Sequence, residues 1–541
     1  MNIVNQTPVL TERFRGMGVA SALVNRATTD PDRAFIRYGS DLLTVGQVDS
    51  RSDALAAALA GLGIESGDRV AIVLPAWPEF VVALFAMAKL GAVAVPLDPR
   101  LTRSELQYML RHSRAVAAIA AEEFQGTDFL QLFEEILVQL PEMHYLVTVG
   151  EEDLWYDDRI FQWEDLLSAG GGRDYPAPSA DPSDDPFAIV YTSGTTGKPK
   201  GVELTHANIL HAAAGTAEIL ELSSDDSIVG VTALFHVFGL GPGILGALTS
   251  GATLILQDTH SAADTLDLVE EWGVTVHYGV PTVFVTEIQE LERQPRDLSS
   301  LRVGVAAGAP VGNDLVERVE RDLCPRLHVA YSLAETASTI CMTRPDDPVE
   351  VRRFTVGRPI EGSEIRILDP QEWKELPVES VGEIAVRGPG VMKGYYRQPR
   401  ETANCFDDEG FFLTGDLGMV DDQGFVHLVG RRKDVIIRAG SNVYPRELED
   451  RLNSHPAVHD AVVVGVPDDV LGEAISACIV PVEGAVVTSE EIQDWCAMTL
   501  ADYKVPDMVR FLDEFPLTGT GKVRRVELSR MLREEQAARR G

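Results

Sequence analysis

Residues 191–202, Tyr-Thr-Ser-Gly-Thr-Thr-Gly-Lys-Pro-Lys-Gly-Val, have the composition of a phosphate-binding loop. They follow an apolar, strand-like segment at 187–190. Glycines let backbone N–H groups turn towards an anion, hydroxyls add donors and lysines add charge. Only two residues separate Gly194 from the Gly-Lys pair at 197, whereas the common nucleoside triphosphate loop needs four there. The run therefore predicts a phosphate site of another kind; a plain surface turn is the structural alternative.

The composition indicates a large acidic protein of two or more domains. The chain has 541 residues, 45% of them hydrophobic, with a net charge of −36. This charge argues against nucleic acid or an anionic membrane as the main partner. Only eight lysines occur. Acid-rich, lysine-poor surfaces suit a high-salt cytoplasm, and a GC-rich genome that favours Arg and Asp codons explains the same composition.

Neither cysteines nor apolar segments indicate a secreted or membrane-spanning protein. The five cysteines form no CxxC pair, which argues against a disulfide framework or zinc site and favours buried small side chains. Residues 1–15 lack the apolar core of a signal peptide. Residues 234–256 are mostly apolar, but Pro242 and several glycines interrupt them, which favours a buried loop, helix and strand. We expect a cytoplasmic protein with no membrane-spanning segment.

Helix and strand patterns alternate over the first 330 residues, which predicts mostly parallel sheets covered by helices. Residues 168–186, rich in Gly, Pro, Ser and Asp, are expected to form a loop before the phosphate strand. The expected helices are 51–62, 78–90, 208–220 and 262–272, and the expected strands are 69–74, 92–96, 187–190, 252–256, 274–278 and 302–306.

The pattern changes in the last third of the chain. Short glycine-bounded strands at 364–368, 382–387 and 424–429 predict a small antiparallel barrel or sheet. Beyond Gly430 we expect helices at 445–454 and 489–500, and strands at 461–466, 473–480 and 509–511. About 110 residues suffice for a separate α+β domain, whose boundary we place near Lys433.

Several further motifs carry reactive or ligand-binding side chains. His236 is one imidazole in an apolar run, which is usually a core histidine. Ser332-x-x-Glu335 has the spacing of a helix N-terminal capping box. Asp416 follows Thr-Gly, and a carboxylate there can accept two hydrogen bonds from a diol or serve a β-turn. Lys522 lies in a Thr-Gly-Thr-Gly-Lys loop, where a lysine is ordinarily solvated.

Taken in order, these motifs resemble those of the adenylate-forming superfamily, in its acyl-CoA synthetase branch. The matching runs are 191–202, 331–336, 410–418, 430–449 and 516–525. Two departures stand in the second run, where Ser332 replaces a glycine and Ala334 replaces a threonine that usually meets the α-phosphate. The resemblance implies an α/β fold: a large N-terminal domain (1–430) of two stacked α/β subdomains and a small distorted β-barrel, a hinge (431–433), and a small mobile α+β C-terminal domain (434–541).

The resemblance also implies a role for each matching residue. Catalysis would fall to Lys522, Glu335, Thr192, Lys198 and Lys200, and Mg²⁺ would bind Glu335 and Thr196. ATP would be held by Ser193, Gly194, Thr195, Thr196, Gly197, Gly308, Ala309, Pro310, Tyr331, Ser332, Thr336, Asp416 and Arg431. The acyl group would lie against His236, Phe238, Gly239, Val280, Ala306 and Gly308. Lys433 would be the hinge, and Gly440 would line the tunnel for the thiol of CoA.

The resemblance implies ligation of a small carboxylic acid to CoA at the expense of ATP, through an acyl-adenylate. The expected pocket segments are small or apolar, which disfavours an amino acid, and the overall pattern most resembles that of the medium- to long-chain fatty acyl-CoA ligases. An aryl acid, coumarate- or benzoate-like, is the nearest alternative. An acyl-AMP ligase that loads a carrier protein, a luciferase-like oxygenase and a non-catalytic binding protein are further alternatives. The sequence leaves the oligomeric state open between monomer and homodimer.

Overall fold

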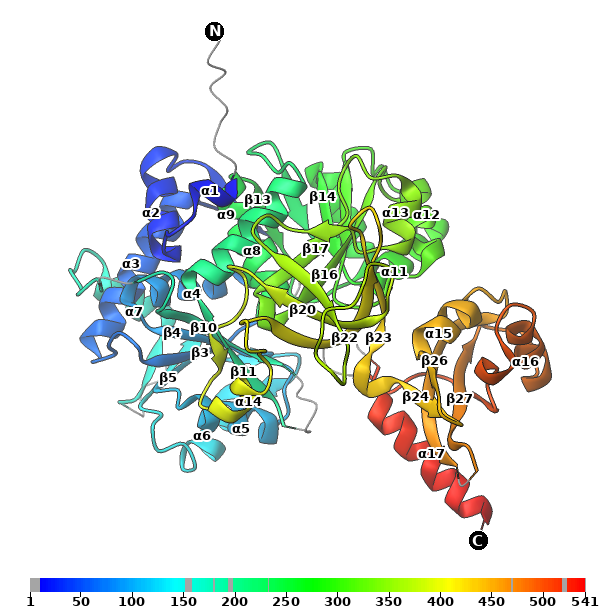
Figure 1. Cartoon of the computed structure of the whole chain (residues 1–541). Coiled ribbons are helices and arrows are strands. Elements are labelled where there is room, and N and C mark those ends of the chain that lie inside the picture. The colour runs from blue at the N-terminus through cyan, green and yellow to red at the C-terminus, as the bar shows by residue number, and fades with distance from the viewer. Residues whose placement is uncertain are drawn as a thin grey trace.

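The structure is a computed structural model that describes residues 10–150, 158–178, 181–192, 198–231, 233–468, 470–517 and 523–540. Two large sheets, a smaller sheet and a separate C-terminal unit make up the molecule (Figure 1). This arrangement confirms the predicted α/β class. No helix in the described ranges is long and apolar enough to cross a membrane.

The first large sheet carries the predicted phosphate strand. Its eight strands run in the order β21-β11-β10-β4-β3-β5-β8-β9 and are parallel from β10 to β9. The strand bounds are β3 Arg69–Val73, β4 Val93–Pro96, β5 Ala117–Ala121, β8 Tyr145–Val149, β9 Ile160–Gln162, β10 Pro186–Thr192, β11 Lys200–Thr205 and β21 Gly394–Tyr395. The associated helices are α3 Val45–Gly61, α4 Pro78–Leu90, α5 Arg103–Ser113, α6 Phe129–Leu137, α7 Trp163–Gly170 and α8 His206–Ile219, and a short hairpin joins β6 Glu123–Phe124 to β7 Thr127–Asp128.

The second large sheet has nine strands in the order β18-β17-β16-β15-β14-β12-β13-β1-β2. Its strand bounds are β1 Ala34–Tyr38, β2 Asp41–Thr44, β12 Ser227–Val229, β13 Thr253–Leu256, β14 Val276–Gly279, β15 Val303–Ala306, β16 Leu327–Leu333, β17 Ser338–Met342 and β18 Arg358–Pro359. Its helices are α1 Leu10–Arg13, α2 Val19–Thr29, η1 Gly239–Leu245, α9 Gly246–Ser250, α10 Ala262–Trp272, α11 Pro281–Arg293, α12 Asn313–Asp322, η2 Ala334–Thr336 and α13 Val349–Phe354.

Helices α4 and α8 lie between the two sheets and join them into one body. Helix α4 contacts β3 and β4 on one side and β1 on the other, and α8 contacts β11 and β17. Every residue of α4 from Phe80 to Leu90 is buried, Lys89 included. The ammonium of Lys89 pairs with Asp49 and Asp53 at 2.7 Å each, so the buried charge is compensated. One continuous apolar core therefore runs through both sheets.

The predicted elements largely match the observed ones. Helices α4 and α10 and the expected strands 364–368 and 382–387 have the predicted bounds. The other expected elements differ at their ends by a few residues, except that α3 begins at Val45 rather than at 51. Several strands were not predicted, and β11 is the one that bears on the phosphate run. Lys200–Thr205 forms this strand, antiparallel to β10, before α8 begins.

A small antiparallel sheet, β19-β20-β22-β23, packs beside the second large sheet, as the sequence predicted for this region. Its bounds are β19 Glu364–Leu368, β20 Gly382–Arg387, β22 Phe412–Val420 and β23 Val426–Arg431, and α14 Pro399–Ala403 lies between β20 and β22 in the chain. Strand β23 ends at Arg431, where the chain leaves the main body.

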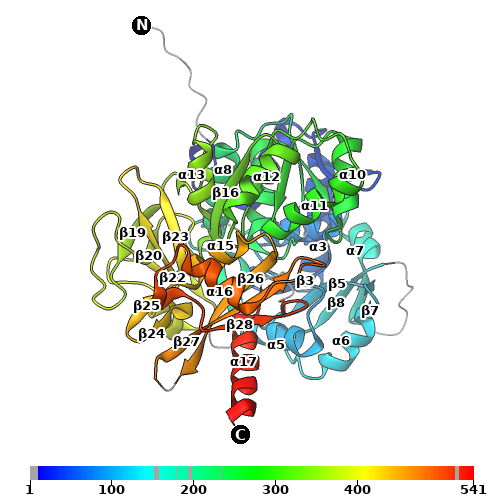
Figure 2. The same ribbon diagram turned by 90° about the vertical axis from the view of Figure 1, so that its right-hand side faces the viewer.

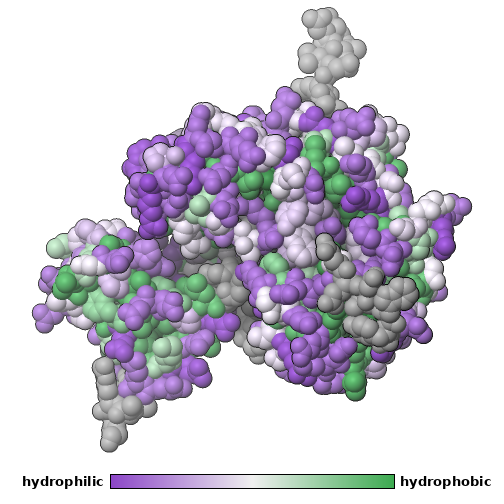
Figure 3. Space-filling view, turned by 180° about the vertical axis from the view of Figure 1, so that it is seen from behind, coloured by the Kyte–Doolittle hydropathy of each residue, from purple (hydrophilic) through white to green (hydrophobic). Residues whose placement is uncertain are grey.

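The C-terminal unit has its own apolar core and lies to one side of the main body (Figures 1 and 2). Its elements are η3 Arg432–Asp434, β24 Ile436–Arg438, β25 Ser441–Val443, α15 Pro445–Asn453, β26 Val458–Asp468, β27 Gly472–Pro481, α16 Ser489–Ala497, η4 Asp502–Lys504, β28 Met508–Phe511 and α17 Arg525–Arg540. The unit exposes large apolar side chains, and Figure 3 shows green atoms over much of its surface. They include Ile437, Val470, Val486, Met498 and Val526.

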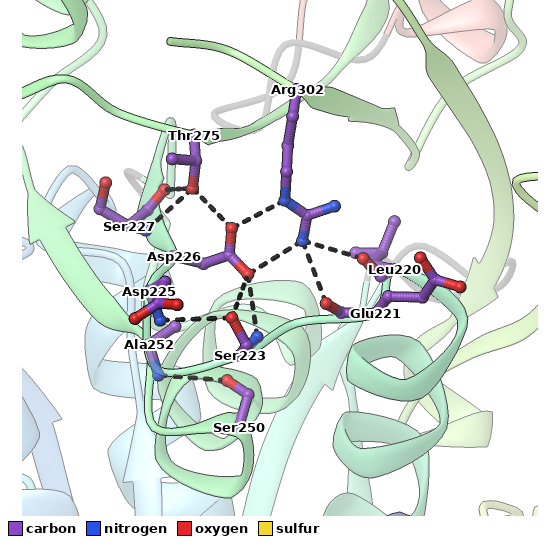
Figure 4. Close-up of polar contacts among 10 residues, drawn as sticks. All are labelled: Leu220, Glu221, Ser223, Asp225, Asp226, Ser227, Ser250, Ala252, Thr275 and Arg302. Carbon is purple, nitrogen blue, oxygen red and sulfur yellow. Dashed lines mark hydrogen bonds and ion pairs between the residues drawn. The ribbon is translucent and has the colours of Figure 1, made fainter.

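A buried carboxylate ties together the starts of three strands in the second sheet (Figure 4). Asp226 is 6% exposed and receives Nε and Nη2 of Arg302 at 2.8 and 2.9 Å, and the hydroxyl of Thr275 at 2.8 Å. Burial alone would raise the pKa of Asp226, but the hydrogen bonds from Arg302, Ser223 and Thr275 bring it below its usual value. The ionised form is therefore the one that stabilises the fold.

We expect Asp226→Asn to lower the free energy of unfolding at pH 7 by about 2 kcal/mol, because a charge-assisted pair at a buried position is lost. A carboxylate with a lowered pKa stabilises fully above its unfolded pKa of about 3.9 and loses that contribution as the pH falls through the folded value. The difference in unfolding free energy between the wild-type protein and Asp226→Asn should therefore be constant from pH 5 to 8 and shrink below about pH 4. Denaturant unfolding at several pH values measures it. Asp225→Asn, at an exposed neighbour, is the matched control, and an equal loss in both variants would contradict this account.

Candidate active site

The phosphate run lies between two antiparallel strands at one edge of the parallel part of the first sheet. Strand β10 ends at Thr192, which pairs with Lys200 at the start of β11. Ser193, Gly194, Thr195, Thr196 and Gly197 lie outside the described residues, so their predicted phosphate contacts stay predictions. Lys200 belongs to a strand rather than to the loop, which is a correction to the sequence analysis.

The two lysines of this run have different surroundings. Lys200 is 14% exposed, pairs with Glu401 at 3.0 Å and lies 4.6 Å above the ring of Tyr395. Lys198 is exposed and lies 5.8 Å from the ring centre of Tyr108. Lys200 is thus held in place by Glu401 and Tyr395. For Lys198, the ring of Tyr108 is the contact found among the described residues.

Glu335, the predicted Mg²⁺ ligand, lies in η2 at the end of β16. Its Oε1 accepts a 2.9 Å hydrogen bond from the hydroxyl of Tyr395, and its carbonyl accepts one from the N–H of Met392 at 2.8 Å. Burial, and then the charge of Glu335, raise the pKa of Tyr395, so the phenol stays a donor. Tyr395 thereby orients the carboxylate of Glu335 and lies beside Lys200. Sequence spacing could not reveal this link, because Lys200 and Tyr395 are 195 positions apart along the chain.

A single carboxylate such as Glu335 fits a Mg²⁺ ion that also binds phosphate oxygens. In the described ranges, no cluster of three or more His, Cys, Asp or Glu side chains could hold a metal by itself. The second predicted ligand, Thr196, is outside those ranges. Mg²⁺ bound here would neutralise phosphate charge and polarise the phosphoryl group.

The turn around Glu335 differs from the predicted helix start. Ser332 pairs with Thr339 across β16 and β17 and caps no helix, so the capping-box interpretation is wrong. The Thr336 hydroxyl donates to the carbonyls of Leu333 and Ser338 at 3.1 and 2.9 Å. Because its hydrogen is used within the turn, Thr336 does not replace the threonine hydroxyl that Ala334 lacks.

Strain marks the same turn. Ala337 and Ser338 have φ of +55° and +120°, in a region where side chains are rarely found. Two consecutive strained residues persist only where the surrounding structure holds them, and such strain is concentrated at functional sites.

Three of the predicted nucleotide residues meet although they come from distant segments. The hydroxyl of Tyr331, in β16, donates to Asp416 Oδ2 at 2.7 Å, and Arg431 Nε lies 3.0 Å from Asp416 Oδ1. Asp416 is 9% exposed in β22, and its charge raises the pKa of Arg431. A carboxylate can accept several hydrogen bonds at once, which is the chemistry that a ligand diol requires of Asp416. Tyr331 is buried and holds Asp416 through its hydroxyl, in addition to its predicted contact with ATP.

Three more of the predicted ATP-binding residues form a turn after β15. Gly308 has φ of +82°, a left-handed conformation that favours glycine, and Ala309 and Pro310 are exposed. A Cβ at Gly308 would lie 3.5 Å from Val280, so the ends of β14 and β15 meet here. Carboxyl ends of parallel strands are where ligands bind in open α/β sheets. Ala306 is fully buried in the strand itself.

The predicted acyl segment forms a short π-helix, η1, ahead of α9. Gly239 at its start has no room for a side chain, because a Cβ would meet the carbonyl oxygen of Ala233 at 2.4 Å. His236 is half-buried, and its Nδ1 accepts the N–H of Phe238 at 3.3 Å. The Phe238 ring packs on the buried ring of Tyr278 at 5.2 Å. Short π-helical turns are frequent at functional sites. This geometry also confirms a buried helix and strand rather than a membrane span over 234–256.

The predicted hinge and tunnel residues lie in the linker and the C-terminal unit. Lys433 is in η3, and its neighbour Arg432 lies 2.8 Å from Glu383, a carboxylate that is 1% exposed. Gly440, with φ of +83°, is in the turn between β24 and β25 and has open space around it. Lys522 lies outside the described residues. The structure thus groups Tyr331, Asp416 and Arg431, and Glu335 with Lys200, but gives Gly440 no contact with either group.

Comparisons with known proteins agree with this arrangement. The family model of the AMP-binding enzyme matches residues 23–396, and that of the AMP-binding enzyme C-terminal domain matches 447–522. A feruloyl-CoA synthase of Amycolatopsis is 35% identical over 522 residues, covering 96% of this chain and 99% of its own. A mitochondrial medium-chain acyl-CoA ligase, ACSF2, of Bos taurus is 30% identical over 526 residues, covering 93% and 85%.

A solved structure is similar along the same length. ATP-bound MatB from Rhodopseudomonas palustris superposes with a TM-score of 0.86 at 28% identity, covering 96% of this chain and 99% of its own. Since family models and relatives match both the main body and the C-terminal unit, the chain belongs to the adenylate-forming superfamily of AMP-binding enzymes and is an AMP-forming acid–thiol ligase.

Proposed function

We propose that this enzyme joins a hydrophobic carboxylic acid to CoA at the expense of ATP, with medium- to long-chain fatty acids as its substrates. The observation that carries the proposal is the meeting of Tyr331, Asp416 and Arg431, with Tyr331 near the carboxyl end of β16. It provides a fixed carboxylate for a ribose diol and a cation for phosphate, next to the turn that carries Glu335.

A free carboxylate is a poor acyl donor, because a nucleophile meets an anion and the leaving group would be oxide. In the proposed first step a carboxylate oxygen of the acid attacks the α-phosphorus of ATP, and the bond to pyrophosphate breaks. In the second step the CoA thiolate attacks the acyl carbon, and AMP leaves with the bonding electrons. The protein has to align two anions, screen their charge and keep water from the acyl-adenylate.

The chain's own residues divide these tasks. Asp416 and Arg431 orient the ribose, while Glu335, held by Tyr395, would bind Mg²⁺ at the phosphates. Lys198 and the loop 193–197 receive the β- and γ-phosphates. Lys522, delivered by the C-terminal unit, bridges the substrate carboxylate and the α-phosphate. Gly440 lines the path of the thiol in a second orientation of that unit.

The substrate class rests on the apolar character of the expected pocket. Phe238, Gly239, Val280 and Ala306 offer no charge for an amino group. An aryl acid is the second candidate, and the 35% identity to a feruloyl-CoA synthase favours it specifically. We also propose that the enzyme acts in the cytoplasm, where ATP and CoA are available.

The substrate is tested by exchange of labelled pyrophosphate into ATP with acetate, octanoate, palmitate, benzoate, coumarate and several amino acids. We expect exchange with octanoate and palmitate, and a thioester only when CoA is added. The assay is run in low and in molar KCl, because of the net charge of −36. Exchange with aromatic acids alone would make an aryl acid the substrate instead. If no acid in the panel supports exchange in either salt, the proposed adenylation is wrong.

Lys522→Ala should slow acyl-adenylate formation by about 10²–10³-fold, because one preorganised charge at the transition state is lost. The second half-reaction, started from a supplied acyl-adenylate and CoA, should change less than about threefold, since that step does not use this lysine. Single-turnover assays of each step measure the two rates. Lys374→Ala removes the same charge from an exposed site and serves as the control. Equal losses in both steps would contradict the role given to Lys522.

Lys433→Pro should separate the two half-reactions, because a fixed φ at the hinge prevents the backbone rotation that exchanges the two orientations. We expect one half-reaction to keep its normal rate within about threefold and the other to fall by more than about tenfold. Lys433→Ala keeps the backbone free and should retain both. Normal rates for both steps in the proline variant would refute the hinge.

A further inference from the structure

A basic cavity lies beside the phosphate run and shares Lys198 and Lys200 with it, while Arg397 and Arg400 have no role assigned above. Its volume is about 490 Å³, and four of its lining residues carry positive charge: Lys198, Lys200, Arg397 and Arg400. Glu401 is the one acidic residue of the described lining, and Lys200 already pairs with it at 3.0 Å. Three cations therefore face this space in a chain whose net charge is −36.

These three cations lack a protein counter-ion in the described part of the chain. No carboxylate there lies within 4.0 Å of Lys198, Arg397 or Arg400, whereas many other arginines, such as Arg296, Arg302 and Arg366, are paired. An acidic protein can neutralise most of its arginines within its own surface. A cavity in which three stay uncompensated attracts an anion of several charges.

The backbone around Arg397 is fixed rather than loose. Strand β21 pairs with β11, and the N–H of Tyr396 donates to the carbonyl of Gly201 at 2.7 Å, so the segment is fixed to the strand that begins at Lys200. Arg397 itself has φ of +55°, a conformation that bulky residues rarely adopt. Such strain persists because neighbouring bonds impose it, and it holds this arginine at the cavity.

The part of the cavity lining that Tyr108 forms is also ordered. The hydroxyl of Tyr108 donates to the carbonyl of Pro199 at 3.2 Å, and its ring lies near Lys198 and stacks on His112 at 5.8 Å. Nδ1 of His112 is hydrogen-bonded to the hydroxyl of Tyr191 at 2.8 Å, and its Nε2 lies 3.4 Å from the side-chain amide nitrogen of Gln398. The cavity is thus bounded by two fixed walls that meet at the end of the phosphate run.

We infer that this cavity is a second anion site that binds inorganic pyrophosphate after it leaves the α-phosphorus. The inference rests on the proposed function, which makes pyrophosphate a product. Guanidinium groups match phosphate oxygens in pairs, so a diphosphate can contact Arg397 and Arg400 while Lys198 stays with the phosphate loop. Holding the product here, away from the acyl-adenylate, would oppose the reverse reaction.

The test is direct binding of pyrophosphate to the whole chain by calorimetry, with ATP at saturation to fill the phosphate loop and with neither acid nor Mg²⁺ present. We expect Arg397→Gln/Arg400→Gln to raise the dissociation constant at least tenfold. Arg397→Lys/Arg400→Lys, which keeps both charges, should raise it less than the glutamine pair. Arg293→Gln/Arg326→Gln, which removes two charges from exposed sites elsewhere, should change it less than twofold.

Several outcomes would overturn the inference. They are the absence of pyrophosphate binding in the wild-type protein, equal binding in the glutamine pair, equal weakening in the control pair, and displacement of pyrophosphate by ATP. A loss of CoA affinity in the glutamine pair with unchanged pyrophosphate binding would assign the cavity to the phosphates of CoA instead, and would also overturn it.

This test is independent of the proposed function because it needs no turnover. If no acid supports exchange but pyrophosphate binds as expected, the ligase proposal fails and the anion site stands. If exchange proceeds with fatty acids and the glutamine pair binds pyrophosphate normally, the site fails and the ligase proposal stands.

Discussion

The carboxylate of Asp416 is the point at which the second large sheet, the small antiparallel sheet and the start of the linker meet. Tyr331 reaches it from the second large sheet, Asp416 itself belongs to the small antiparallel sheet, and Arg431 is the last residue before the linker. A carboxylate that is 9% exposed is costly to bury alone, so both oxygens need partners. The contacts that Tyr331 and Arg431 make with these oxygens fix the geometry of the proposed ribose site. Because Arg431 precedes the linker, they also attach the start of the linker to that site.

Charge is organised in the same way across the rest of the site. Glu335 is oriented by a neutral phenol, Lys200 is neutralised by Glu401, and Arg432 covers the buried carboxylate of Glu383 beside the hinge. Rotation about Lys433 that moved Arg432 away would leave Glu383 buried with less compensation, which favours the present orientation. Against this background of pairing, the unpaired cations beside the phosphate run are the exception that suggests a ligand.

The C-terminal unit is stabilised by apolar clusters of its own. Its apolar clusters include residues from Ile436 to Leu532 and none from the main body. Its exposed Ile437, Met498 and Val526 leave apolar surface that a second orientation could cover (Figure 3). Internal stability with a short linker is the property that a domain needs if it is to rotate as a unit.

The sequence by itself determined the fold class, the order of the motifs and the residue types of the site. Strong local patterns made this possible: an apolar run between Pro78 and Leu90 predicts a buried helix, and a Gly-Ser-Thr run after a strand predicts an anion loop. The family resemblance assigned the roles of Tyr331, Asp416 and Arg431, which the structure then brought together.

Only the tertiary structure decided which groups hold these residues and what surrounds them. Tyr395 beside Glu335, Glu401 beside Lys200 and Arg397 beside the phosphate run come from a segment nearly 200 residues beyond the loop, which enters the first sheet as the edge strand β21. Strand β11 was missed because its residues were read as part of the loop. Spacing along a chain reports local geometry, whereas such contacts depend on how distant strands pair.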